Sequence, residues 1–343
     1  MKLISVIIPA YNASAFIENC INSVLKQTYT NFEIVVVNDG SKDNTLEILE
    51  ALAKKDSRIR VFNQENAGVS AARNKAISEA RGELMTCLDA DDAFLENALA
   101  DMAELMTDDV DFIIASHYEI RFSKKPQPKK DMIIPAQEIN SRFLEFDRMI
   151  WFPWAKMFRT DIVKNNHILY DTNITFGEDH IFNLSYTKHI KGSVAVTSKY
   201  VYNYYCIRGG LCSKYYPDMH SLQKYVLNGI IKYFGSAEDI PQEYLDHYTG
   251  CYMAGCFDYY IAWLSPTKAE KKIRETLDIY GDIINDEMLK RLYTEKQYSY
   301  IKSGNIKGFM RDYIIKNPKQ TVWRKIKRTI RRILEEIQNK LIK

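Results

Sequence analysis

The stretch Leu3-Ile4-Ser5-Val6-Ile7-Ile8-Pro9-Ala10-Tyr11-Asn12 sets the pattern of the N-terminal third of this chain: an apolar run that ends in a polar turn. An unbroken apolar run of this length is expected for a strand that is buried on both faces. The run stops at Pro9 without a small-residue cleavage site, so we interpret it as a first strand and not as a signal sequence.

The same pattern recurs outward from this stretch, with segments of helical spacing between the apolar runs. Alternation of this kind predicts an α/β fold in which a mostly parallel sheet is flanked by helices, a Rossmann-like architecture. The further expected strands are Phe32–Val37, Arg60–Phe62, Leu84–Leu88 and Phe112–Ala115, and the expected helices are Ala15–Gln27, Thr45–Lys54, Val69–Ala80 and Leu95–Met106. Ligands of such sheets bind at the carboxyl ends of the strands.

Polar or acidic residues follow each of the first four expected strands, which predicts one shared site. The strongest group is Asp89-Ala90-Asp91, after a buried strand. Two carboxylates in one turn can bind Mg²⁺ or Mn²⁺, which completes its shell with water and phosphate oxygens. The alternative is that this acidic turn caps the helix that begins near Leu95, because Asp is a favoured N-cap residue.

The other strand ends suit a nucleotide. Tyr11 could stack on a base, and Asp39 could accept hydrogen bonds from a base or ribose, although Asp39 could equally belong to a turn and helix cap. Residues 66–68 open a helix, so their backbone N–H groups could bind phosphate. Arg73, one turn further, could reach a diphosphate or the aspartates. The chain has no GxGxxG after its first strand and no GxxxxGK[ST], which disfavours dinucleotide oxidoreductases and P-loop enzymes.

Four segments in this order resemble the successive motifs of family 2 glycosyltransferases, which have the GT-A fold. The resemblance covers residues 3 to about 110 closely and extends more loosely to about 210. The segments are Ser5-Val6-Ile7-Ile8-Pro9-Ala10-Tyr11-Asn12, Val36-Val37-Asn38-Asp39-Gly40-Ser41-Lys42-Asp43, Asn66-Ala67-Gly68-Val69-Ser70-Ala71-Ala72-Arg73-Asn74 and Cys87-Leu88-Asp89-Ala90-Asp91-Asp92.

The resemblance implies an inverting hexosyl- or N-acetylhexosaminyltransferase that uses a nucleoside-diphosphate sugar, usually a UDP-sugar, together with Mn²⁺ or Mg²⁺. Asp91, with Asp89, would bind the metal and the diphosphate. The residues that it places at the donor are Pro9, Ala10, Tyr11, Asn12, Asp39, Asn66, Gly68, Arg73, Asp89, Ala90 and Asp91.

Family members also carry a Glu-Asp pair on the acceptor side, which Glu178-Asp179 matches. The resemblance implies that Asp179 is the general base and that Glu178 assists acceptor binding. Inversion needs a carboxylate that takes the acceptor proton on the face opposite the leaving diphosphate, so the base cannot sit in the metal cluster and should come from a part of the sequence far from it. The alternative, a simple helix N-terminus, is compatible with this role.

The segments Trp151–Phe158 and Tyr202–Arg208 resemble less constant parts of the family. Lys156 or Arg208 could balance the diphosphate, and Trp154 could line the sugar or acceptor cavity, although aromatic clusters are more often core. Asp92 and His180 are further acceptor-side candidates, and His180 could also be only a helix residue.

Composition suggests how the chain is divided. We expect a catalytic domain at 1–215, with a donor half at 1–115 and an acceptor half at 116–215, then a helical region at 216–315 and a basic amphipathic helix at 316–343. Residues 316–343 hold ten Lys or Arg and two Glu, whereas the rest of the chain is mildly acidic. The six cysteines show no ligand spacing and are expected to be reduced thiols of a cytoplasmic protein.

The basic tail has an apolar stripe flanked by cations, the profile of a helix that lies on an anionic membrane. Residues 320–343 could instead dock on the body of the protein or pair with another subunit in an oligomer. We therefore expect a peripheral protein at the inner face of the cell membrane. The resemblance to family 2 glycosyltransferases, together with this tail, implies a glycan or lipid-linked acceptor from cell-surface polysaccharide synthesis. Nucleic acid is not expected, because no recognition motif accompanies the charge. The alternatives are a nucleotidyltransferase and a non-catalytic nucleotide-sugar or glycan-binding module.

Overall fold

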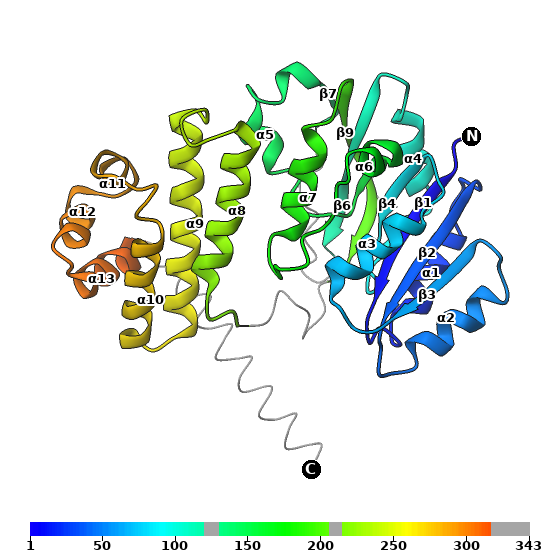
Figure 1. Ribbon diagram of the computed structural model, residues 1–343, viewed down its shortest axis with the longest axis horizontal. Coiled ribbons are helices and arrows are strands. Elements are labelled where there is room, and N and C mark those ends of the chain that lie inside the picture. Colours follow the sequence, from blue (N-terminus) through cyan, green and yellow to red (C-terminus); the bar gives the residue numbers. More distant parts are fainter. Residues whose placement is uncertain (120–129, 206–214, 317–343) are drawn as a thin grey trace, which may run out of the picture. The chain divides into compact units, whose positions relative to one another are not determined.

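A computed structural model describes residues 1–119, 130–205 and 215–316 of this chain. The chain falls into two compact units, Met1–Ser213 and Lys214–Lys343. In the described residues the first unit contains the sheet and its covering helices, and the second is helical (Figure 1). Arg208 and the predicted basic helix of residues 320–343 lie outside the described residues.

The first part of the sheet is parallel. Strand β1 pairs in parallel with both β2 and β4, and β2 pairs in parallel with β3. The elements of this part are β1 (Ile4–Ala10), α1 (Ile17–Leu25), β2 (Phe32–Asp39), α2 (Thr45–Ala53), β3 (Ile59–Gln64), α3 (Val69–Glu79) and β4 (Leu84–Cys87). The predicted alternation of strands and helices is confirmed here, and the fold class is α/β.

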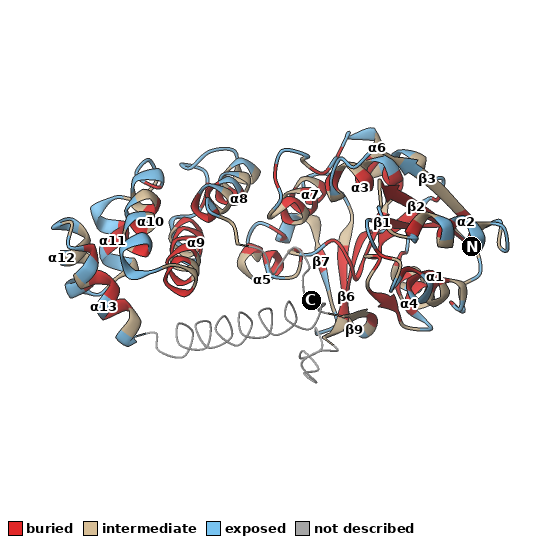
Figure 2. Ribbon diagram, turned by 90° about the horizontal axis from the view of Figure 1, so that it is seen from below, coloured by how far each residue is buried: buried red, intermediate tan, exposed pale blue. Residues whose placement is uncertain are grey.

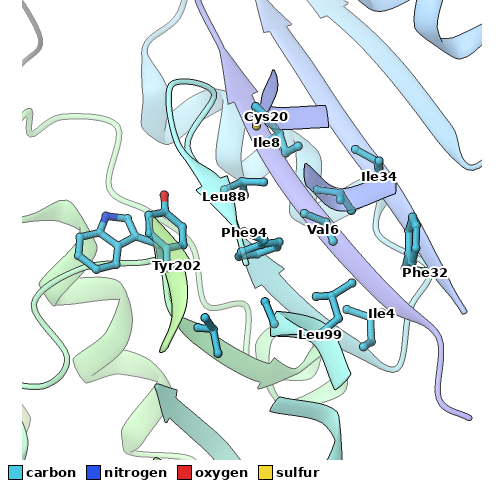
Figure 3. Packing of buried hydrophobic residues seen from close by; sticks show 14 of the residues in the cluster. Ile4, Val6, Ile8, Cys20, Phe32, Ile34, Leu88, Phe94, Leu99 and Tyr202 are labelled. Atoms are coloured by element: carbon cyan, nitrogen blue, oxygen red, sulfur yellow. The ribbon is translucent and has the colours of Figure 1, made fainter. Parts of the chain in front are cut away.

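Burial explains the continuous apolar runs. Every residue of β1 and β2 is buried, as expected for central strands covered on both faces. Figure 3 shows alternate residues of β1 (Ile4, Val6 and Ile8) packed with Phe32 and Ile34 of β2 on one side of the sheet. Fully burying side chains of this size stabilises the fold by about 1.5–3 kcal/mol each.

Beyond β4 the sheet is mixed. The strand order is β3-β2-β1-β4-β8-β6-β9-β5, with β7 also paired to β9. Strand β8 is antiparallel to both of its neighbours, whereas β6 and β9 are parallel to each other. The mostly parallel architecture thus applies to the first part of the sheet. The elements here are β5 (Ala93–Phe94), α4 (Ala98–Leu105), β6 (Val110–Glu119), β7 (Met132–Pro135), η2 (Ala136–Glu138), α5 (Phe143–Asp147), β8 (Lys156–Arg159), α6 (Thr160–Asn165), α7 (Glu178–Thr187) and β9 (Ser193–Tyr204).

The second unit is helical over its described residues, as the sequence predicted. Its longest helix, α9, is buried along much of its length (Figure 2). The helices are α8 (Met219–Phe234), α9 (Gln242–Trp263), α10 (Pro266–Ile279), α11 (Asp286–Leu292), α12 (Glu295–Lys302) and α13 (Ile306–Lys316). Within the described ranges, no helix is both long and apolar enough to cross a membrane.

Candidate active site

The turn after β4 places three carboxylates in different environments. Asp92 is buried and accepts hydrogen bonds from the Tyr202 hydroxyl at 2.7 Å and the Tyr205 backbone N–H at 2.7 Å. Burial, reinforced by the charge of Asp89, raises the pKa of Asp92 to about 8. Asp92 therefore fastens this turn to the end of β9.

Asp89 and Asp91 remain partly accessible in the same turn. Burial, together with the negative charge of Asp89, raises the pKa of the Asp91 carboxyl to about 6. A divalent cation shared by two such carboxylates would relieve this repulsion. In the described part of the chain no group of three or more His, Cys, Asp or Glu side chains could hold a metal. These two carboxylates fit Mg²⁺ or Mn²⁺, which take one or two protein carboxylates and complete their shell with phosphate and water.

Arg73 of α3 lies at the centre of the site. One terminal nitrogen of its buried guanidinium donates to Asp89 Oδ1 at 2.9 Å, and the other donates to Asp179 Oδ1 at 2.6 Å. The guanidinium carbon also lies 5.2 Å from the ring centroid of Tyr170. Of the two alternatives that the sequence left for Arg73, the structure shows the contact with the aspartates.

Asp179 reaches this site from the first turn of α7. The helix begins after Gly177, whose φ of 81° is left-handed and favours glycine. The Asp179 side chain is 21% exposed. Burial raises its pKa to about 7, although the Arg73 cation opposes the rise. A carboxylate with a pKa near neutrality suits general-base catalysis. Glu178 is buried beside it, with its carboxylate 3.8 Å from Arg73.

The carboxylate of Asp39 accepts its hydrogen bonds from other groups of the protein. It accepts hydrogen bonds from the backbone N–H groups of Ala67 at 2.8 Å and Gly68 at 2.9 Å, and from the Gln64 amide at 2.8 Å. The expectation that these two N–H groups are free for phosphate is therefore wrong, because Asp39 already occupies the N-terminus of α3. Asn66 adds a bond from its amide to the Asp39 carbonyl at 2.9 Å.

The end of β1 is joined to the loop after β2. Asn12 has a φ of 48° and accepts a hydrogen bond from the Lys42 N–H at 2.8 Å. Pro9 and Ala10 are buried in β1, as Ala90 is in the acidic turn, whereas Tyr11 is 47% exposed. The exposed ring of Tyr11 is open to a ligand at this sheet edge, as its predicted role requires.

The residues predicted on the acceptor side are mostly buried. His180 is fully buried with Nε2 2.5 Å from Asp147 Oδ1, and its ring stacks on Trp151 at 4.7 Å. Trp154 is 5% exposed. Lys156, which was predicted at the donor diphosphate, is also buried; it donates to the Trp154 carbonyl at 3.2 Å and lies close enough to lower the pKa of Asp179. Like Asp92, His180 and Trp154 contact protein neighbours, and any part that they take on the acceptor side is indirect.

Two contributors to this site were not singled out from the sequence. Asn74 donates to the Tyr170 carbonyl at 2.8 Å and accepts from the Tyr170 N–H at 2.8 Å. Tyr170 in turn stacks on Phe182 of α7 with ring centroids 4.1 Å apart. These contacts tie α3 to α7 beneath Arg73. Asn74 lies in a recognised motif, but no periodicity or spacing marks Tyr170.

Residues 5–166 match the sequence profile described as Glycosyl transferase family 2. EpsJ of Bacillus subtilis, named an uncharacterized glycosyltransferase, is 36% identical over 193 residues, which cover 54% of this chain and 56% of EpsJ. Chondroitin synthase of Pasteurella multocida is 42% identical over 92 residues, which cover 27% of this chain and 10% of the synthase. The match thus spans about half the length of EpsJ and a tenth of the length of chondroitin synthase.

The fold is also found in a solved structure. S. aureus TarS, residues 1–349 in complex with UDP-GlcNAc, superimposes with a TM-score of 0.67 at 22% sequence identity, with 90% of each chain covered. Likeness at this identity establishes the architecture, which is GT-A. Within this architecture, the similarity to glycosyl transferase family 2 lies in residues 5–166 of the N-terminal unit.

Proposed function

We propose that the protein transfers a hexosyl or N-acetylhexosaminyl group from a UDP-sugar to a hydroxyl of a glycan or lipid-linked acceptor, with inversion, in cell-surface polysaccharide synthesis. The observation that carries this proposal is Arg73, which contacts Asp89 on the donor side and Asp179 on the acceptor side. TarS was crystallised in complex with UDP-GlcNAc, and chondroitin synthase is named for a polysaccharide product, which supports this donor and acceptor class.

In the proposed reaction Asp179 accepts the proton of the acceptor hydroxyl. The hydroxyl oxygen forms a bond to the anomeric carbon, and the bond from that carbon to the diphosphate oxygen breaks, so that UDP leaves with the bonding electron pair. Arg73 holds Oδ1 of Asp179, which leaves Oδ2 for the proton. A base on the face opposite the leaving group is what inversion requires.

The proposed cofactor is Mn²⁺ or Mg²⁺, held by Asp91 and Asp89. When bound, such an ion neutralises the charge that develops on the departing diphosphate. The donor residues of the chain would act beside it: Tyr11 would stack on the base at the open sheet edge, and Asp39 would keep the loop before α3 in place.

Two other functions are less well supported. A nucleotidyltransferase would share the metal-binding turn but would not need the carboxylate of Asp179 linked to it. A non-catalytic binding module would not need a carboxylate with a pKa near neutrality, whereas Asp179 has one. The contact between Arg73 and Asp179 therefore favours the transferase.

Donor turnover tests this function. UDP release from UDP-Glc, UDP-Gal, UDP-GlcNAc and UDP-GalNAc should be measured with Mn²⁺ or Mg²⁺ and with excess chelator. At least one donor should be hydrolysed or transferred, and chelator should stop the reaction. Absence of turnover with every nucleotide sugar would count against the transferase, and undiminished turnover in chelator would remove the metal role of Asp89 and Asp91.

Membrane association through residues 320–343 also stays a prediction, together with the division of the chain at 215 and 315. The full chain should bind vesicles that contain phosphatidylglycerol, and truncation after Lys316 should abolish this binding, because it removes the net positive tail. Sedimentation with these vesicles measures the effect, and vesicles of phosphatidylcholine alone are the control. Binding that survives truncation would reject this role for the tail.

A further inference from the structure

An exposed aromatic ring stands beside the proposed acceptor site. Phe152 lies in the segment between α5 and β8, and the residue is 48% exposed. One face of its ring is stacked on Trp154, with centroids 4.7 Å apart and planes within 7° of parallel. The exposed surface must therefore be the opposite face and the edges of the ring.

Phe152 rests on a rigid support. The Trp154 ring, which is buried, also stacks on Tyr202 at 4.8 Å and on Tyr204 at 5.5 Å. Tyr202 is fixed in turn by its bond to Asp92. A flat apolar face that is held in place before a ligand arrives loses little side-chain entropy on binding.

Hydrogen bonds join the backbone of the Phe152 segment to the helix that carries Asp179. Asn183 of α7 donates to the backbone carbonyls of Ile150 at 2.6 Å and Phe152 at 2.9 Å. Asn183 lies four residues after Asp179, so both side chains are on the same side of α7, about one helical turn apart. At the other end of the stack, the Tyr202 hydroxyl accepts the backbone N–H of Asp89 at 3.2 Å. The aromatic stack is therefore attached both to the helix of the base and to the metal-binding turn.

We propose that Phe152 is a stacking platform for a pyranose ring of the acceptor, which rests on the proposed transferase function. One face of a pyranose exposes C–H groups while its hydroxyls point outward from the rim. Such a face matches a single aromatic ring, and the hydroxyls stay available to polar neighbours such as Asp179. The acceptor class that this surface fits is a sugar ring at the end of a glycan, and the ring would present its hydroxyl to the base.

Direct binding to the full chain tests the proposal. Saturation-transfer NMR should be recorded with methyl β-glucoside, methyl β-galactoside and methyl N-acetyl-β-glucosaminide, and with mannitol, an open-chain polyol without a ring face. At least one glycoside should receive saturation through its C–H face, and mannitol should not. Equal signals from mannitol, or none from any glycoside at tens of millimolar, would overturn the platform.

Point variants test whether glycoside binding depends on the ring of Phe152. Phe152→Ala should weaken glycoside binding about fivefold, the typical value of one aromatic stacking contact, and Phe152→Trp should retain it. Ile133→Ala is the matched control, because Ile133 is an equally exposed apolar residue of the same unit, at 55%. Unchanged glycoside binding in Phe152→Ala, or the same loss in Ile133→Ala, would overturn the proposal.

Donor hydrolysis without acceptor separates this proposal from the function on which it rests. The wild-type protein should release UDP from the donor, and Phe152→Ala should weaken glycoside binding; the two proposals together require both results. Absence of hydrolysis in the wild-type protein, with glycoside binding intact, would reject the transferase and leave a glycan-binding surface.

Discussion

The parallel and the mixed parts of the sheet position their functional side chains in different ways. In the parallel part, from β3 to β4, site residues follow the strand ends, and neighbouring loops bond directly, as Asp39 does with Gly68. In the mixed part, Asp179 comes from the start of a helix, and Phe152 comes from an irregular segment.

This difference shows in which part of the sheet the spacing of residues along the sequence is enough to predict the site. Parallel strands bring their carboxyl ends to one edge whatever lies between them, so the donor side assembles from local patterns. In the mixed part, antiparallel β8 reverses the direction of the chain, and Asp179 reaches the site through its contact with Arg73. Arg73 is the point where the two parts meet, and substitutions on either side should have separable effects.

Asp179→Asn should have the largest effect on the transfer rate, and this effect should be confined to the acceptor side. Loss of the base should lower the transfer rate by about a hundredfold to ten-thousandfold, while UDP binding by calorimetry stays close to wild type. Asp108→Asn, at an exposed carboxylate of the same unit, is the control and should be neutral. Wild-type turnover in Asp179→Asn would remove it as the base.

Arg73→Met should disturb both sides. Removal of one partner of a buried ion-pair cluster should lower the free energy of unfolding by about 3–5 kcal/mol, measured by denaturant titration. In the wild-type protein the transfer rate should rise with pH through about 7, as Asp179 loses its proton. Arg73 holds the pKa of Asp179 down, so the variant should move this rise to higher pH.

Arg73→Lys keeps the positive charge but loses the two guanidinium nitrogens that donate to separate carboxylates. This variant replaces Arg73→Met in the test if Arg73→Met fails to fold. Its pH profile should stay near that of the wild type, whereas its turnover should fall, because one ammonium cannot hold both carboxylates in the same geometry. A pH profile that is identical in wild type and Arg73→Met would disconnect Arg73 from the base.

Asp39→Asn should affect the donor side alone. The amide replaces an acceptor of three hydrogen bonds and leaves backbone N–H groups of the α3 start poorly paired, at a cost of about 1–3 kcal/mol. The KM for the nucleotide sugar should rise, whereas the pH at which turnover reaches half its maximum should not move. A shift of that pH would show that the two sides are not separable.

Gly177→Ala should have the smallest effect, on the acceptor side. A left-handed conformation costs an alanine about 1–2 kcal/mol, and the strain falls at the start of the helix that carries Asp179. We expect turnover to fall a few-fold with little change in donor KM. Gly304→Ala, at a φ of 68° in the second unit, is the matched control: it should lose similar stability and keep wild-type turnover.

Much of the parallel part could be predicted from the sequence. The strands β1 to β4 and the helices α1 to α3 lie where the apolar runs and helical spacing indicated. Strands β1, β2 and β4 are buried throughout, so their burial shows directly in their composition. The acidic turn after β4, which is the proposed metal site, and the start of α7 were likewise indicated by acidic residues at element boundaries. The roles of these residues in catalysis remain predictions.

The rest depended on contacts between distant segments. Spacing could not show that Asp39 fills the N-terminus of α3, since the two are brought together by the pairing of β2 with β3. The sequence could not show that Phe152 is exposed and its neighbour Trp154 is buried. Both occur in the same aromatic segment, and the fold decides which of them is buried. Nor does any pattern reveal Tyr170 beneath Arg73.

The guanidinium of Arg73, which Asp89 and Asp179 share, implies an order in which donor and acceptor act. While both Asp89 and Asp179 are anionic, its single positive charge is divided between them. A metal-bound donor that engages Asp89 would leave more of that charge to Asp179, which would then release its proton more readily. The acceptor hydroxyl would therefore meet a competent base chiefly after the nucleotide sugar has arrived.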